Sequence, residues 1–76
     1  MKTPDFLRLL DELLELPAGT LQGPESLKSF YQWDSLANVG FIALVDRELG
    51  LAVEPGKIAA AGTVDDLLAL VREKLE

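Results

Sequence analysis

The sequence predicts a small all-α protein, a four-helix bundle with a long loop between its first two helices and a short third helix. Leucine, alanine and valine dominate a hydrophobic content of 49%, whereas aromatic residues make up only 7%, a mixture that favours packed helices over strands. Apolar residues recur at the spacing of one helical face, and prolines and glycines interrupt this pattern. A chain of 76 residues is short for more than one core, so residues 1–76 are expected to form a single domain.

The first helix is predicted to start at Thr3, a favoured N-cap residue, with Pro4 at the first helical position. Pro17 and Gly19 end it. Its apolar face comprises Phe6, Leu9, Leu10, Leu13 and Leu14. Its opposite, solvated face is expected to carry Arg8, Asp11, Glu12 and Glu15.

Residues 18–32 are predicted to form a long loop, because they contain Gly19, Gly23 and Pro24 and no sustained period. Loops of this length are uncommon in compact domains unless they serve a purpose. A short helical turn is weakly indicated over residues 25–29. The side chains expected to anchor the loop to the core are Leu21, Leu27, Phe30 and Tyr31.

The second helix is predicted to begin with Asp34 as N-cap and Ser35 at the first helical position, and to end at Leu49 with Gly50 as a left-handed cap. Its buried stripe is expected to contain Phe41, Ile42, Val45 and Leu49. A different face carries Leu36, Gly40, Ala43 and Arg47. A glycine inside a helix costs about 0.5–1 kcal/mol relative to alanine. Either close approach of another surface or chance explains Gly40, and the sequence favours chance.

The third helix is predicted to be short, from Glu54-Pro55 through Ala61, with Gly62 ending it. Thr63 then caps a fourth helix that has Asp65 and Asp66 in its first turn. The inward residues of the fourth helix are expected to be Val64, Leu67, Leu68, Val71 and Leu75, and its last turns are expected to carry Arg72 and Lys74.

The composition excludes several kinds of chemistry. There is no histidine and no cysteine, so Ser-His-Asp and Cys-His catalysis and thiolate or imidazole metal ligation are ruled out. We therefore expect no metal site and no enzyme, and Ser35 needs another protein to activate its hydroxyl. The net charge is −6, which disfavours nucleic acid and favours a basic protein surface as partner. Solubility alone explains this charge equally well.

The chain is expected to be a cytoplasmic monomer. No uninterrupted apolar run is longer than Phe41–Val45, which is far too short to span a membrane. Met1-Lys2-Thr3 is followed by a charged amphipathic segment, which is unlike the apolar core of a signal peptide. The absence of cysteine gives no evidence of a secreted disulfide framework.

The second half of the chain carries a combination of motifs that points to a family. Asp34-Ser35-Leu36 opens a helix that ends at Leu49-Gly50, and Val53, a turn at Pro55 and the segment Thr63-Val64-Asp65-Asp66-Leu67 follow. This combination resembles the acyl and peptidyl carrier proteins. The resemblance covers the chain from the second helix onward, whereas the first helix and the long loop agree with the family only in type.

The resemblance implies that Ser35 carries a 4′-phosphopantetheine arm derived from coenzyme A, whose thiol holds an acyl or aminoacyl group as a thioester. It also implies three partners: a phosphopantetheinyl transferase, an enzyme that loads the acyl or aminoacyl group, and a downstream synthase or transferase. Asp34 is expected to support Mg²⁺ in the loading complex, a role compatible with that of a plain N-cap. The partner face is expected to comprise Trp33, Leu36, Gly40, Ala43 and Arg47, although Trp33 is more readily explained as a loop anchor.

Two departures from the family pattern concern the choice of pathway. Carriers of fatty-acid synthesis usually have a glycine two residues before the aspartate and a row of acidic residues along the second helix. Here Gln32-Trp33 precedes Asp34, and only Asp46 and Glu48 are acidic in that helix. A specialised pathway, such as polyketide, nonribosomal-peptide or surface-polymer modification, is therefore expected. The alternative is a helical protein–protein interaction module without a prosthetic group.

Overall fold

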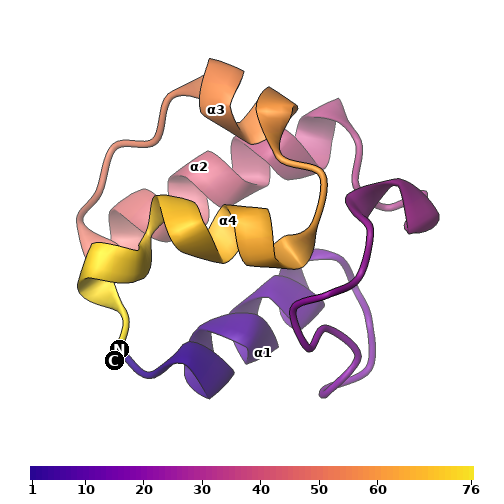
Figure 1. The fold of residues 1–76 in the computed structure, drawn as a ribbon, viewed down its shortest axis with the longest axis horizontal. Coiled ribbons are helices and arrows are strands. Elements are labelled where there is room, and N and C mark those ends of the chain that lie inside the picture. Colours follow the sequence, from indigo (N-terminus) through magenta and orange to yellow (C-terminus); the bar gives the residue numbers. More distant parts are fainter.

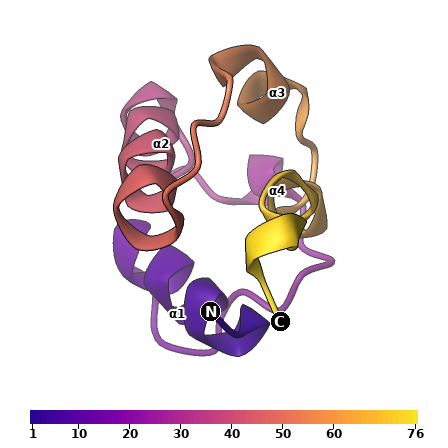
Figure 2. The same ribbon diagram turned by 90° about the vertical axis from the view of Figure 1, so that its left-hand side faces the viewer.

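The computed structural model describes all residues from Met1 to Glu76 and contains four α-helices and no β-strand. The predicted all-α class is confirmed. The helices are α1 (Thr3–Leu13), α2 (Ser35–Leu49), α3 (Pro55–Ala60) and α4 (Val64–Leu70) (Figure 1), and two short 3₁₀ turns cover Leu27–Ser29 and Arg72–Lys74. Viewed from the side, the four helices lie around a common centre (Figure 2). None of them has the length and apolarity needed to cross a bilayer.

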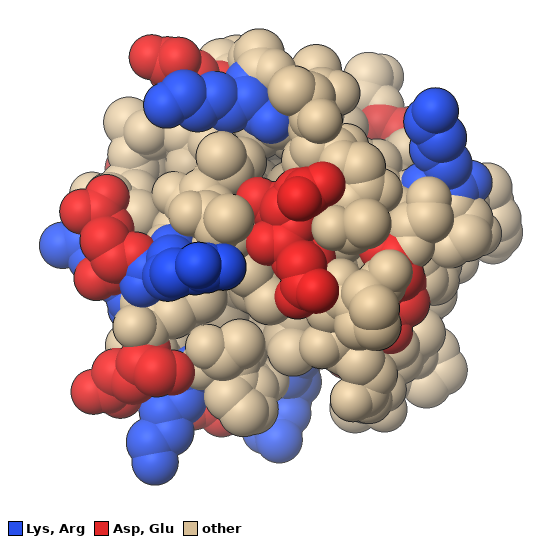
Figure 3. All heavy atoms as spheres, viewed as in Figure 1, with Lys and Arg blue, Asp and Glu red and all other residues tan.

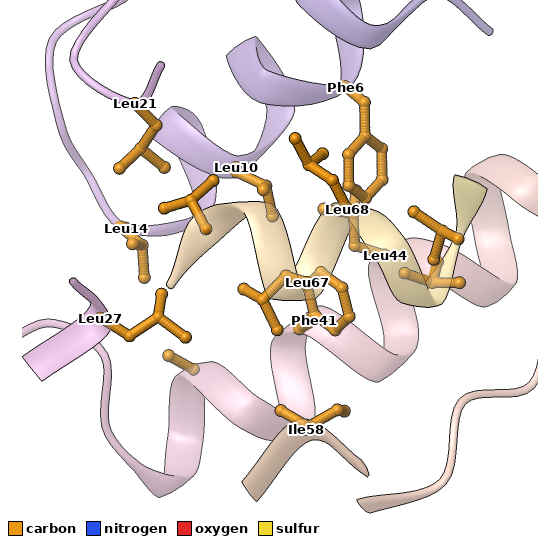
Figure 4. Close-up of a cluster of buried hydrophobic side chains, with 14 residues drawn as sticks. Phe6, Leu10, Leu14, Leu21, Leu27, Phe41, Leu44, Ile58, Leu67 and Leu68 are labelled. Atoms are coloured by element: carbon orange, nitrogen blue, oxygen red, sulfur yellow. The ribbon is translucent and has the colours of Figure 1, made fainter. Parts of the chain in front are cut away.

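The centre is filled by 14 buried apolar side chains contributed by all four helices, the long loop and the segment after α4. These side chains point toward one another from the different elements (Figure 4). Phe41 is fully buried, and its ring packs edge to face against Phe6 and Trp33, with centroid distances of 6.2 Å and 6.1 Å. This arrangement is a favourable one for aromatic rings. The three rings therefore join α1 to α2 and to the residue that precedes the α2 cap.

The predicted apolar faces are largely confirmed, with two differences in α2. Ala37 and Leu44 are buried, although they were not predicted to be, whereas Ile42 and Leu49 are only half-buried. The reason is that α2 contacts both α1 and α3, so residues beside the predicted stripe are buried as well.

Both ends of α1 differ from the prediction. Lys2 is the N-cap without a side-chain hydrogen bond, and Thr3 is the first helical residue. The Thr3 hydroxyl instead donates to the carbonyl of Glu76 at 3.3 Å. At the other end Glu15 adopts φ 57°, and the N–H groups of Glu15 and Leu16 donate to the carbonyls of Glu12 and Asp11. This is the Schellman pattern, and it ends α1 before Pro17.

The prediction that Asp11 is solvated is wrong. Asp11 is 1% exposed, and its Oδ1 and Oδ2 accept hydrogen bonds from the N–H groups of Leu21 and Gly19, each at 3.0 Å. The loop folds back across α1 and covers this position. Asp11 consequently ties the start of the loop to α1.

The loop is anchored as predicted by Leu21 and Leu27, which are buried, and Phe30 is half-buried. The prediction for Tyr31 is wrong, because its side chain is 89% exposed. The weakly indicated helical turn is the 3₁₀ turn Leu27–Ser29.

Farther along, the loop pairs with the segment that leads into α4. Ser26 and Thr63 form an isolated antiparallel bridge. On either side of it, the Leu27 N–H donates to the Gly62 carbonyl at 2.9 Å and the Asp65 N–H donates to the Gly23 carbonyl at 2.8 Å. Gly23 has φ 135°, and a Cβ there would collide with the Asp65 carboxylate. Only glycine fits this position without strain.

The predicted caps of α2 and α4 are confirmed. Asp34 caps α2, and Gly50 ends it in the left-handed region with φ 66°. Thr63 caps α4 in a reciprocal capping box with Asp66. α4 ends at Leu70, so Arg72 and Lys74 lie in the following 3₁₀ turn and not in α4.

Gly40 marks the contact between α1 and α2. A Cβ at this position would lie 2.7 Å from Cδ1 of Leu13, which is closer than two carbon atoms pack. The Leu13 side chain of α1 thus lies against this position, which favours close approach of α1 over the chance explanation favoured from the sequence.

The capping box of α4 predicts a pH dependence of stability. The N–H groups of Gly62 and Thr63, at 2.8 Å and 3.0 Å, hold the pKa of the Asp66 carboxyl below its ordinary value of 3.8. A carboxyl whose pKa is lowered by folding stabilises the protein above its ordinary pKa, and this stabilisation is lost as the pH falls through the lowered value. We expect Asp66→Asn to reduce the stability that is lost as the pH falls from neutral to below the ordinary pKa of 3.8, measured by urea unfolding.

The matched control is Asp65→Asn, because the Asp65 side chain accepts none of the hydrogen bonds of the cap. It should flatten the pH profile less than Asp66→Asn does. Equal flattening of the profile by both substitutions would contradict the assignment to the capping box.

Candidate functional site

Ser35 is the exposed first residue of α2, at the point where the long loop ends. Asp34 directly before it has an extended backbone, and its Oδ1 accepts a hydrogen bond from the Ala37 N–H at 2.9 Å. The Asp34 carbonyl accepts from the Asn38 N–H at 3.0 Å and from its Nδ2 at 2.7 Å. The start of α2 is therefore well ordered by local hydrogen bonds, and Ser35 is presented at its tip.

The tip of α2 has the electrostatic character of a helix N-terminus. Asp34 provides acceptors for the N–H groups of Ala37 and Asn38, and those of Ser35 and Leu36 belong to the first turn, where helices lack internal acceptors. The positive end of the helix dipole lies at the same place. An anionic group attached to the Ser35 oxygen would be favourably placed there.

An open groove of about 520 Å³ lies beside Ser35. Trp33, Ser35 and Asn38 line it on one side, and α3 and the residue after it line the other through Ile58, Ala59 and Ala61. Trp33 forms part of the wall while its ring packs on Phe41. A group attached to Ser35 would thus begin in open space beside a firmly packed wall.

The chain itself offers little to activate the Ser35 hydroxyl. It contains no histidine or cysteine, and no group of three or more acidic residues is gathered in a way that could hold a metal ion.

Comparisons with protein-family models, with curated proteins and with solved structures find no match.

The structure brings together three of the five residues predicted for the partner face. Leu36, Gly40 and Ala43 line one groove of about 510 Å³ between α2 and the end of α1, which we call the α1–α2 groove. Trp33 and Arg47 do not line it. Trp33 is half-buried against Phe41, in agreement with its interpretation as a loop anchor. Arg47 lies in the last turn of α2 and pairs with the neighbouring Glu48 at 3.0 Å.

Among the residues of the α1–α2 groove that were not predicted to belong to a functional surface, two are strongly exposed and apolar. Val39 is 62% exposed and Tyr31 is 89% exposed, and both line the groove beside Leu36, which is 77% exposed. The helical period could have indicated Val39, since it follows Leu36 by one turn. Nothing in the sequence indicated Tyr31, because its place depends on how the loop meets α2.

Proposed function

We propose that this protein is a carrier that holds an acyl or aminoacyl group as a thioester on a 4′-phosphopantetheine arm attached to Ser35. The observation that carries the proposal is the exposed serine at the first position of α2, directly after the Asp34 cap and beside an open groove. A carrier needs one accessible hydroxyl for loading and needs no catalytic pocket of its own.

The chemistry of loading is compatible with this arrangement. The Ser35 oxygen attacks the phosphorus of coenzyme A that bears the pantetheine, and the pyrophosphate bond breaks. Adenosine 3′,5′-bisphosphate leaves, a phosphodiester to Ser35 forms, and the serine proton passes to a base of the phosphopantetheinyl transferase. The resulting anion lies at the positive end of α2. Asp34 uses Oδ1 for the cap, and we propose that Oδ2 of this exposed side chain supports Mg²⁺ in the transferase complex.

The remaining parts of the proposal follow from the resemblance to carrier proteins. The four helices correspond to a carrier-type bundle with its long loop before the serine. The partners are the transferase, a loading enzyme and a downstream synthase or transferase, and the carrier works as a cytoplasmic monomer. Because only Asp46 and Glu48 are acidic in α2, we propose a specialised pathway and not housekeeping fatty-acid synthesis.

The test is loading in vitro. Incubation with coenzyme A, Mg²⁺ and a promiscuous phosphopantetheinyl transferase should add the mass of one phosphopantetheinyl group to the intact protein. Ser35→Ala should abolish the addition, and the matched control Ser26→Ala, which alters another exposed serine, should not. Failure of the natural protein to gain mass while a known carrier is loaded in the same mixture would count decisively against the proposal.

The second candidate is a helical interaction module without the arm, and the exposed apolar side chains of Tyr31, Leu36 and Val39 favour it. It predicts that the protein gains no mass on incubation with the transferase. It also predicts that Ser35→Ala leaves partner binding unchanged, so the same pair of variants separates the two functions.

A further inference from the structure

We propose that residues 19–27 form a strap that opens as one unit when acid protonates Glu25 and Asp66, and that its opening loosens the wall of the groove beside Ser35. The strap is the part of the long loop that runs from the end of α1 past the start of α4 (Figure 1). Hydrogen bonds hold it at its start, in its middle and at its end. The proposal does not depend on whether Ser35 carries an arm.

Asp11 holds the start of the strap. Its buried carboxylate accepts hydrogen bonds from the N–H groups of Gly19 and Leu21, each at 3.0 Å. The charged residues near it on α1 are exposed and form no ion pair with it: Arg8, Glu12 and Glu15. The start of the strap is thus attached to α1 by this one carboxylate, together with the buried Leu21 side chain.

Glu25 shapes the middle of the strap. Its carboxylate accepts from the Gln22 N–H, at 3.0 Å and 2.9 Å for the two oxygens, and from the Gly23 N–H at 2.8 Å. The carbonyls of Gly23 and Glu25 in turn accept from the N–H groups of Asp65, at 2.8 Å, and Val64, at 3.1 Å. The turn that Glu25 closes therefore carries both carbonyls that pair with the start of α4.

Asp66 shapes the opposing segment in the same way. Its carboxylate accepts from the N–H groups of Gly62 and Thr63 at 2.8 Å and 3.0 Å. The Gly62 carbonyl accepts from the Leu27 N–H, at the end of the strap, at 2.9 Å. Each of the two paired segments is therefore held in shape by one carboxylate. Because the hydrogen bonds between the segments need both shapes, we expect them to break together.

No basic side chain pairs with either of these carboxylates. Acidic side chains gather over the part of the molecule occupied by α4 (Figure 3), and the Asp65 carboxylate lies against Gly23 of the strap. The ion pair of Arg47 with Glu48 is the only one in the protein. No lysine or arginine, including Lys28 directly after the strap, therefore lies within 4.0 Å of the two carboxylates. Backbone N–H groups are their hydrogen-bonding partners, and these bonds weaken when the carboxylates lose their charge.

The pKa values of the two carboxyls give the direction of the pH effect. Desolvation raises the pKa of Glu25, but the N–H groups of Gly23, Glu25 and Gln22 outweigh it and hold this pKa below its ordinary value of 4.5. The pKa of Asp66 is likewise held below 3.8. Carboxyls with lowered pKa values stabilise the folded form above the ordinary values, and this stabilisation is lost as the pH falls through the lowered values. The strap is therefore closed at neutral pH and released in acid.

The end of the strap belongs to the groove beside Ser35. Leu27 is 2% exposed and lines this groove together with Trp33 and Ser35. Release of the strap uncovers the Leu21 and Leu27 side chains and frees the part of the groove wall that Leu27 forms.

Hydrogen exchange of backbone amides, measured by NMR, tests whether the strap is held by its carboxylates. Glu25→Gln removes the charge at neutral pH and keeps the shape of the side chain. We expect the protection factors of the Leu27, Val64 and Asp65 amides to fall together by about tenfold, because hydrogen bonds to a charged acceptor are about twice as strong as neutral ones. The matched control is Glu54→Gln, since Glu54 is exposed and makes no capping hydrogen bond. It should change none of these amides.

The Leu21 amide tests whether the strap opens as one unit. Its acceptor, Asp11, is untouched in Glu25→Gln, so this amide loses protection only if the whole strap opens. We expect it to lose protection, whereas the amide of Val45 inside α2 should keep it. Unchanged protection of Leu21 would show a merely local role of Glu25, and equal loss at Val45 would show that the strap opens only with the whole protein. Either result would overturn the proposal.

An acid titration tests the switch and its effect on the groove. As the pH falls from neutral to below 3.8, the strap amides of the natural protein should lose protection before the Val45 amide does, and the indole N–H signal of Trp33 should shift over the same range. The double variant Glu25→Gln with Asp66→Asn should show much smaller changes. Strap amides that stay protected in acid, or a double variant with the natural pH dependence, would refute the switch. Opening of the strap without a shift of the Trp33 signal would refute its effect on the groove.

Discussion

Phe41→Ala is expected to lower the free energy of unfolding by about 3–5 kcal/mol. Phe41 is fully buried, and its ring contacts those of Phe6 and Trp33 edge to face. The substitution removes the apolar area of the ring, both aromatic contacts and the support of the surrounding side chains. A domain of this size is stable by about 4–11 kcal/mol in total, so a large share of its stability depends on this one side chain.

Urea unfolding followed by circular dichroism measures this loss. The control is Phe30→Ala, because Phe30 is half-buried at the edge of the core and should cost clearly less. If the variant protein does not fold, Phe41→Leu keeps most of the volume and should lose about 1–2 kcal/mol. Equal losses for Phe30→Ala and Phe41→Ala would contradict the central place of Phe41.

Asp11→Ala is expected to lower the free energy of unfolding by about 2–3 kcal/mol. The buried carboxylate accepts hydrogen bonds from the Gly19 and Leu21 N–H groups. Without it the Leu21 N–H has no acceptor in a site closed to water, because Leu21 itself is only 3% exposed. An unsatisfied buried donor is costly, although removal of the buried charge offsets part of the loss.

Glu12→Ala on the same helix provides the matched control, since Glu12 is exposed and its loss should change stability by no more than about 0.5 kcal/mol. Hydrogen exchange gives a local readout: the amide of Leu21 should lose its protection in the Asp11 variant and keep it in the Glu12 variant. Equal stability of the two variants would show that the buried hydrogen bonds of Asp11 contribute nothing.

Both predictions bear on the candidate site through the long loop. Asp11 holds the start of the loop, and Trp33 packs its end on Phe41, two residues before Ser35. Between them, Leu27 is buried and its N–H donates to the Gly62 carbonyl. The loop is thus attached to the rest of the molecule along its length. These contacts explain how a segment without regular structure can hold Ser35 in one position at the start of α2.

The sequence by itself determined the features that depend on neighbouring residues. The bounds of α2, its Asp34 cap, its Gly50 end and the Thr63 cap of α4 were predicted correctly, because capping and backbone preferences act within a few residues. The exposure of Ser35 follows from the same local rules, as does most of the core, since helical periodicity marks the inward faces.

Only the tertiary structure decided the features that depend on contacts between distant segments. Asp11 was predicted to be solvated, but the loop covers it in the structure. Gly40 was attributed to chance, but the Leu13 side chain lies against it. Tyr31 was wrongly predicted to anchor the loop for the same reason. Whether a side chain is buried, packed or left exposed in a groove depends on which other element lies opposite, and local preferences carry no information about that partner.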